Sequence, residues 1–175
     1  MKSRTFSRAL AITAVILLAT APLAAQEPQL PKNVISANPF GLLLEFFNAE
    51  YERAISESST IGIGGSTFET EVDELLAEPR DERYLNADVF YRFYPSGQPL
   101  NGWAFGVKAG VTDVTDAGTY VGMGFDVNRS WLLGKRNNFY VGLGFGLKRL
   151  FGTDDDDIEL SFIPTIRIIN VGVAF

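Results

Sequence analysis

Alternation of apolar and polar residues is the dominant pattern in this chain. Near its end, for example, Val141, Leu143, Phe145 and Leu147 fall at every second position, and glycine fills most of the gaps between them. A spacing of two is the period of a β-strand, whose successive side chains point to opposite faces, whereas a helix groups apolar residues three and four apart. The pattern therefore predicts strands that each carry one apolar face.

Segments of this kind follow one another along the chain after the lead-in QEPQLPK, and turn-rich breaks separate them. There are eight, at residues 33–43, 46–55, 60–68, 83–94, 102–113, 118–129, 138–150 and 159–175. None shows a convincing amphipathic helical pattern. Even spacing and an even number of strands favour an all-β fold, an eight-stranded antiparallel up-and-down β-barrel.

The first residues follow a different pattern. Lys2, Arg4 and Arg8 precede an apolar run, and small residues close the segment. This order predicts a secretory signal peptide that is cleaved after Ala25. The expected organisation is a signal peptide at 1–25, a periplasmic lead-in at 26–32 and a barrel domain at 33–175. No later apolar segment approaches the roughly 20 residues of a membrane helix, so a membrane location would require a transmembrane barrel that closes on itself.

Composition removes several classes of function. The formal charge is −6 for the whole chain and becomes 12 − 21 = −9 once the three basic residues of the leader are removed. Such an acidic chain is not expected to bind nucleic acid, which requires a basic face. There is no cysteine and no histidine. Without histidine the chain lacks the usual general base and the commonest metal ligand, so we predict no catalytic residue, no cofactor and no enzyme activity.

The connections between the predicted strands are of two kinds. STFETEVDELLAEPRDER, TDVTDAG and FGTDDDD carry most of the acidic residues, whereas SESS, PSGQPLN and LLGKRNN are shorter or less acidic. The first hairpin, around Leu44 and Glu45, is the exception because it is predicted to be tight. Transmembrane barrels have short periplasmic turns and longer external loops. The acidic loops are therefore predicted to face the exterior.

The two faces of the strands also differ in a way that suggests an inverted barrel. One face has large apolar residues, and the other is rich in glycine, which makes room inside a narrow barrel. Aromatic residues near the strand ends match the interfacial girdles of membrane barrels. They are Tyr51, Tyr91, Phe93, Trp103, Trp131 and Phe139. We therefore predict that the apolar faces meet lipid and that the glycine-rich faces line the interior.

Charged residues on the glycine-rich faces balance each other. The four acids are Glu50, Glu52, Asp88 and Asp126, and the four bases are Arg92, Lys108, Lys148 and Arg167. The interior of an eight-stranded barrel is just wide enough to be filled by side chains. Charges enclosed there must pair, because an isolated buried charge is very unfavourable. The sequence predicts an interlocked network of salt bridges instead of an open pore. Although paired carboxylates can act as an acid–base pair, Glu50 and Glu52 are assigned to this network.

The last strand interrupts the alternation. Counted back from Phe175, every second residue is apolar until Arg167, which would then point to lipid. A β-bulge near Ile168 would return Arg167 to the interior and place Ile166 and Pro164 outside. The alternative is an outward Arg167 whose side chain reaches the membrane surface, which costs more the nearer the residue lies to the bilayer centre.

One further acidic cluster has the chemistry of a cation site. It consists of Asp154, Asp155, Asp156 and Asp157. Carboxylates are calcium ligands, but consecutive aspartates on an extended path diverge and lack the ligand spacing of a known calcium loop. A solvated acidic tip is the favoured interpretation. As a hypothesis, the acidic loops bridge to lipopolysaccharide through divalent cations.

Both ends of the predicted barrel resemble known proteins. FIPTIRIINVGVAF resembles the closing strand of bacterial outer-membrane barrels, which implies that Phe175 is part of a signal read by the barrel-assembly machinery. NVISANPFGLLLEFFNAEYERAI, with its element Glu50, Tyr51, Glu52 and Arg53, is similar to the opening hairpin of a family of small outer-membrane-barrel-like proteins. The architecture resembles OmpX and the transmembrane domain of OmpA. This resemblance implies an outer-membrane location, contact with outer-membrane lipid and lipopolysaccharide, and a monomer.

Taken together, the sequence predicts an integral outer-membrane barrel with a polar interior plugged by side chains and a structural or surface-contact role without catalysis. One alternative is a soluble exported barrel of the lipocalin type, in which the apolar faces would line a cavity for a small apolar ligand. Another is a narrow pore of low conductance, which the balanced interior charges argue against.

Overall fold

A computed structural model describes residues 30–40, 46–72, 80–115, 117–151 and 162–175, with the backbone alone for 70–72 and 80–82. The chain divides into two compact units, Met1–Leu30 and Pro31–Phe175. The predicted signal peptide, residues 1–25, lies outside the described residues. All the strands belong to the second unit.

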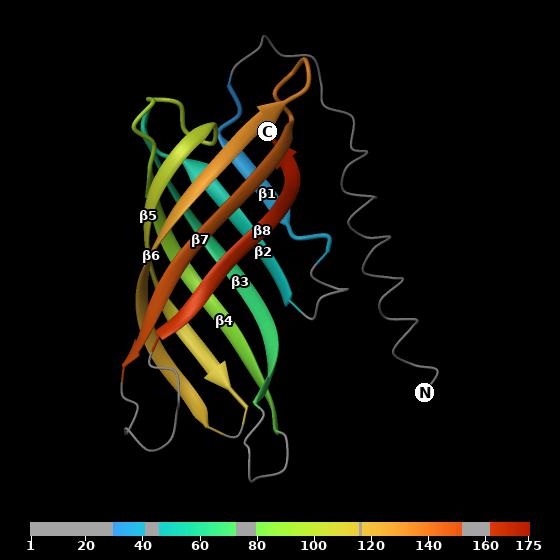
Figure 1. The fold of residues 1–175 in the computed structure, drawn as a ribbon. Coiled ribbons are helices and arrows are strands. Elements are labelled where there is room, and N and C mark those ends of the chain that lie inside the picture. Colours follow the sequence, from blue (N-terminus) through green and yellow to red (C-terminus); the bar gives the residue numbers. More distant parts are fainter. Residues whose placement is uncertain (1–29, 41–45, 73–79, 116, 152–161) are drawn as a thin grey trace. The chain divides into compact units, whose positions relative to one another are not determined.

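The second unit is a closed antiparallel barrel (Figure 1). Its strands are β1 (Asn33–Ala37), β2 (Phe46–Ala54), β3 (Ser59–Val72), β4 (Arg80–Phe93), β5 (Gly102–Val114), β6 (Gly118–Leu133), β7 (Phe139–Phe151) and β8 (Phe162–Ala174). Each strand pairs with the next in the chain, and β1 pairs with β8 to close the barrel. The predicted all-β, eight-stranded, up-and-down antiparallel barrel is therefore confirmed.

The largest differences from the predicted strand ends occur in β1, β3, β4 and β6, of which β6 runs to Leu133 instead of residue 129. β1 stops at Ala37, well before residue 43, because Pro39 has no N–H to continue a ladder and the Asn38 side chain accepts a hydrogen bond from the Phe40 N–H at 2.9 Å. The predicted tight hairpin at Leu44 and Glu45 lies outside the described residues. β3 and β4 extend into the segment predicted to be an acidic loop, because their backbones continue to pair as far as Val72 and Arg80.

The two ends of the barrel differ in their connections. One end has the short turns that join β2 to β3, β4 to β5 and β6 to β7, and it also has the start of β1 and the end of β8; we call it the turn end (top of Figure 1). The opposite end is called the loop end. At the turn end, Asn33 donates its N–H to the Phe175 carbonyl at 2.8 Å, and Phe175 donates in return at 2.9 Å. These bonds fasten the first strand to the last.

Side chains alternate between the outside and the inside of the barrel. Val107 on β5 is 60% exposed and Phe125 on β6 is 56% exposed, whereas Ala104 and Asn128 on the same strands are almost fully buried. The predicted assignment of faces is confirmed: the large apolar residues point outward and the glycine-rich faces point inward. No helix in the described part of the chain is both long and apolar enough to cross a membrane.

The predicted bulge lies in β8. Gly142 of β7 pairs with Asn170, but Gly144 pairs with Arg167, so β8 has one extra residue at this point. Ile168 and Ile169 both face outward, 42% and 41% exposed, and Arg167 is returned to the interior. The bulge therefore repairs the break in alternation that the sequence contains.

Apolar clusters fill both ends of the barrel interior. At the turn end the cluster is Val34, Leu100, Tyr140 and Ala174, and at the loop end it is Tyr84, Val114, Leu150 and Ile163. Leu100 comes from the turn between β4 and β5, has a positive φ of 67° and is completely buried. The turn thus places an apolar side chain in the mouth of the barrel.

Candidate functional site

The candidate site is the charged layer that lies between the two apolar clusters. All eight charged residues predicted from the sequence occupy inward positions in this layer. Six of them form one connected set of ion pairs: Glu50, Glu52, Asp126, Arg92, Lys108 and Arg167. Asp88 and Lys148 form a separate pair, with 2.6 Å between Lys148 Nζ and Asp88 Oδ1. Each set contains equal numbers of acids and bases.

Arg92 lies at the centre of the connected set. Its Nη1 atom is 2.7 Å from Glu52 Oε2 and 3.0 Å from Glu50 Oε2, and its Nε atom is 3.6 Å from Asp126 Oδ1. The guanidinium also lies 4.0 Å from the centre of the Phe90 ring. Arg92 is 1% exposed. It therefore joins β2, β4 and β6 across the interior.

Both carboxylate oxygens of Glu52 have partners in the interior. Besides the contact with Arg92, its Oε1 atom accepts hydrogen bonds from the Thr60 hydroxyl at 2.6 Å and the Tyr94 hydroxyl at 2.7 Å. Tyr94 lies just beyond β4, and burial and the Glu52 carboxylate hold the pKa of its phenol well above the usual value. The phenol therefore stays protonated and remains a donor.

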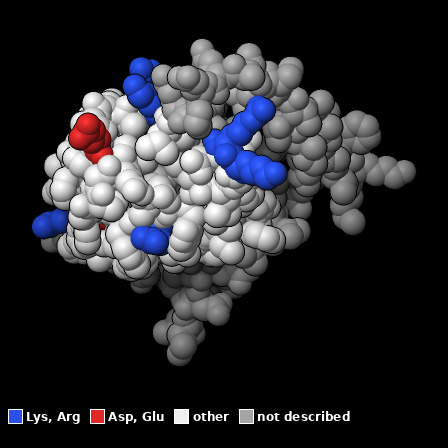
Figure 2. Space-filling view, turned by 90° about the horizontal axis from the view of Figure 1, so that it is seen from above, with Lys and Arg blue, Asp and Glu red and all other residues white. Residues whose placement is uncertain are grey.

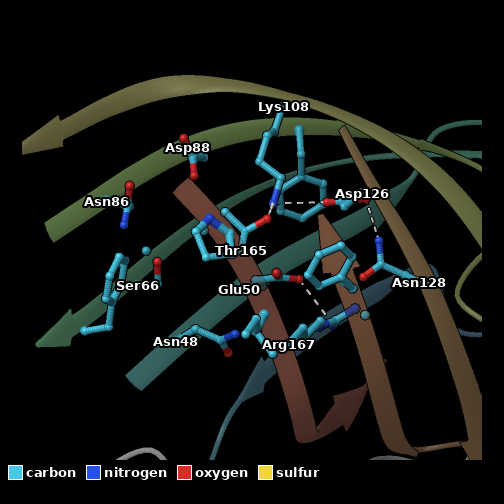
Figure 3. A pocket seen from close by; sticks show the side chains of 18 of the residues that line it. Asn48, Glu50, Ser66, Asn86, Asp88, Lys108, Asp126, Asn128, Thr165 and Arg167 are labelled. Atoms are coloured by element: carbon cyan, nitrogen blue, oxygen red, sulfur yellow. Dashed lines mark hydrogen bonds and ion pairs between the residues drawn. The ribbon is translucent and has the colours of Figure 1, made fainter. Parts of the chain in front are cut away.

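Arg167 and Lys108 extend the network around the barrel. Arg167 Nη2 is 3.2 Å from Glu50 Oε2 and donates to the Tyr140 hydroxyl at 2.9 Å. Lys108 Nζ is 3.3 Å from Asp126 Oδ2 and donates to the Thr165 hydroxyl at 3.0 Å (Figure 3). The bulge in β8 thus turns an arginine that would have faced outward into a partner of the interior carboxylates.

Glycine gives these side chains their space. A Cβ atom on Gly106 would collide with the Asp126 carboxylate, and one on Gly62 would collide with the Phe90 ring. Asp126 and Phe90 in turn contact Arg92. Glycine is therefore required beside the network because any side chain would displace the groups that hold the arginine.

A small polar cavity adjoins the network. Its volume is about 50 Å³, and its lining includes Asn48, Ser66, Asn86 and Asn128 (Figure 3). A cavity of this size has room for a few water molecules. Amide atoms of Asn48, Asn86 and Asn128 have no hydrogen-bond partner among the described residues. Because buried polar atoms are ordinarily bonded to protein or water, we expect water to occupy the cavity.

The geometry uses the carboxylates for pairing. Glu50 and Glu52 both contact the same arginine, so neither is a free acid or base. No group of three or more potential metal ligands occurs among the described residues. The aspartates at 154–157 lie outside the described residues.

The outer surface is a second feature of functional interest. The six aromatic residues predicted to lie near strand ends all lie towards the turn end, where Trp103 is 55% and Phe139 is 47% exposed. Towards the loop end, Phe151 and Phe162 are 45% and 54% exposed. Between these two aromatic zones the outward residues are mainly Val, Ile, Leu, Phe and Met. We call this outward surface the apolar belt.

Sequence reasoning missed several interior residues. Thr60, Tyr94 and Thr165 were not predicted as partners of the charges. The sequence could have revealed Thr60, because it lies an even number of residues from other inward positions of the same strand. Leu100 had no such signal, because it lies in a turn where the alternation stops. The turn conformation that buries it is visible only in the folded chain.

Comparison with known proteins adds one structure. The chain is similar to the N-terminal β-barrel domain of OprF from Pseudomonas aeruginosa, with 14% sequence identity and a TM-score of 0.43 over 84% of this chain and 100% of that domain. No family model and no curated protein matches the chain.

Proposed function

We propose that this chain is an integral outer-membrane β-barrel whose interior is plugged by its own side chains, with a structural or surface-contact role and no catalytic activity. The observation that carries the proposal is the apolar belt. Large apolar side chains are exposed around the barrel, from Ile35 on β1 to Ile169 on β8. An apolar surface of this extent on a folded protein indicates contact with a partner or a membrane.

The dimensions of the belt fit a bilayer. On β7 the outward residues run from Phe139 to Phe151, a distance of 151 − 139 = 12 residue steps. At about 3.3 Å per residue and a strand tilt of about 40°, this corresponds to a height of about 30 Å. The apolar band of transmembrane barrels is about 25 Å tall and is flanked by aromatic residues. A barrel of the lipocalin type would instead turn these residues inward around a ligand.

The layered interior favours a plugged barrel over a pore. The ion pairs lie between two apolar clusters, and the cavity beside them holds only about 50 Å³. An ion that crossed would have to separate pairs such as Arg92 and Glu52, which are both 1% exposed. Separating a buried pair leaves an uncompensated charge and is strongly unfavourable.

The proposed orientation places the loop end outside the cell. Short turns on the periplasmic side are the rule in transmembrane barrels. The loop end would then display the acidic segments, including Asp154, Asp155, Asp156 and Asp157, to lipopolysaccharide and its divalent cations. Phe175, which pairs with Asn33 at the turn end, would serve the barrel-assembly machinery during insertion. We further propose that the barrel is a monomer.

Membrane fractionation and gel migration test the proposal. The expressed protein is expected to stay with outer-membrane fragments after a carbonate wash and to migrate differently with and without boiling, because a closed barrel resists unfolding by detergent. Release into the wash, with no heat-dependent shift, would contradict the proposal and would favour a soluble barrel.

Planar-bilayer recording tests the closed interior. The reconstituted wild-type barrel is expected to show no sustained ion conductance. A variant with Leu100→Ala and Arg92→Met together, which opens the turn end and removes the central cation, is the matched comparison. Regular channel openings by the wild type would contradict the plugged interior. An equal conductance in the variant would then establish a pore that these two side chains do not close.

A further inference from the structure

Arg129 is a cation on the outer surface of the apolar belt. It faces outward on β6, directly opposite Trp103 of β5 and Leu143 of β7. Its guanidinium lies 5.7 Å from the centre of the Trp103 ring and 5.4 Å from that of Trp131. The two indoles therefore hold the charge near the turn end of the belt.

This cation has no anionic protein partner within the described part of the chain. No carboxylate among those residues forms an ion pair with Arg129, although the interior arginines each pair with one or more. An arginine near the edge of a bilayer extends its head towards the polar layer. A headgroup of the membrane is the anion available at this level.

The end of the barrel nearest Arg129 is basic. The exposed charged residues at the turn end among those described are Lys32, Arg53, Lys135, Arg136 and one acid, Glu57. Figure 2 looks down onto this end, the top of Figure 1, and its described residues show more basic than acidic side chains. Lys135 and Arg136 belong to the turn that follows Trp131 by only a few residues. A positive field at this level attracts negatively charged headgroups and disfavours headgroups that carry their own cation.

We propose that Arg129, Trp103 and Trp131 form a binding site for the phosphate of an anionic phospholipid headgroup in the leaflet at the turn end. The guanidinium would donate hydrogen bonds to the phosphate, and the indoles would position the lipid at headgroup level. Lys135 and Arg136 would add selectivity against zwitterionic lipid. The site rests on the proposed membrane location and adds a lipid partner to it.

Arg149 provides an internal comparison. It also faces outward between two aromatic rings, with 5.7 Å from its guanidinium to the centres of both Phe151 and Phe162. However, it lies towards the loop end, and the sequence next to it continues into the four consecutive aspartates at 154–157. The same local geometry therefore occurs once at the basic turn end and once beside an acidic stretch of the sequence.

Tryptophan fluorescence reports on the site directly, because Trp103 and Trp131 are the only two tryptophans in the chain. The full barrel is reconstituted in bilayers of phosphatidylcholine and phosphatidylglycerol, with bromine on the acyl chains of one lipid at a time. Brominated chains quench tryptophans that they contact. The relative quenching by the two lipids measures which one occupies the site.

Wild-type protein is expected to prefer phosphatidylglycerol by about fivefold, the effect of about one basic residue near an anionic lipid. Arg129→Gln is expected to abolish most of this preference, Arg129→Lys to retain part of it, and Arg149→Gln to leave it unchanged. The heat-dependent gel shift verifies that each variant is folded. Equal quenching by both lipids in the wild type, or an unchanged preference in Arg129→Gln, would overturn the proposal.

The experiment separates this site from the membrane location itself. Quenching by brominated phosphatidylcholine alone shows that the tryptophans contact acyl chains, whichever headgroup is preferred. No quenching by either lipid would count against both the membrane barrel and the site. Strong but unselective quenching would leave the membrane barrel intact and remove only the anionic lipid site.

Discussion

Replacing Arg92 with methionine removes the cation that three interior carboxylates share. In the connected set, three acids and three bases become three acids and two bases, so one negative charge is left without compensation. Methionine is similar in length to the arginine stem and apolar, so the change removes the charge and its hydrogen bonds with little loss of packing. The backbone of β4 is unaltered.

The expected loss in the free energy of unfolding is about 3–5 kcal/mol, the usual effect of removing one partner from a buried ion pair. Arg92 is 1% exposed, and its partners Glu50, Glu52 and Asp126 have side chains that are 13%, 1% and 4% exposed. Solvent therefore screens these charges weakly. A surface ion pair would contribute at most about 1 kcal/mol.

Urea unfolding of the barrel in lipid vesicles, followed by tryptophan fluorescence, measures this loss. Arg53→Met is the matched control, because Arg53 is also a basic residue, lies next to Glu52 in the chain and is exposed. Its effect is expected to stay within about 0.5 kcal/mol. The double variant Glu52→Gln with Arg92→Met restores the charge balance and is expected to be more stable than Arg92→Met alone.

Two results would refute this reasoning. A loss below about 1 kcal/mol for Arg92→Met would mean that the interior charges are screened as surface charges are. A double variant whose loss equals the sum of the two single losses would mean that Arg92 and Glu52 do not interact, despite the 2.7 Å between them.

Three further predictions concern the bulge, a buried phenol and the turn-end apolar cluster. Deleting Ile168 removes the extra residue of the bulge without changing which residues face inward, so the heat-dependent gel shift is expected to persist. Deleting Thr165 instead inverts the start of β8, and the shift is expected to disappear. Tyr94→Phe leaves a buried carboxylate short of a donor and is expected to lower the free energy of unfolding by about 1–3 kcal/mol in urea titrations; no change would mean that water replaces the phenol. Leu100→Ala creates a cavity in the mouth and is expected to cost about 2–5 kcal/mol in the same titrations, whereas a loss below about 1 kcal/mol would show that the turn does not seal the barrel.

Local patterns in the sequence determined the strands and their faces. The side-chain period of a strand is fixed by backbone geometry, so residues such as Phe145 and Gly146 can be assigned to opposite faces without knowledge of any partner strand. The same counting located the bulge, because Arg167 fell out of phase with the residues that follow it. The absence of histidine also follows from the chain alone.

Only the tertiary structure decided which interior groups meet. Arg92 and Glu52 are 40 residues apart, and Arg167 and Ser36 are 131 residues apart. Their contacts depend on the stagger of all eight strands around the closed barrel, which no single segment encodes. The end of β1, the extension of β3 and β4 and the burial of Leu100 were likewise set by hydrogen bonding and turn geometry. Alternation specifies the direction of a side chain, and closure of the barrel specifies its neighbour.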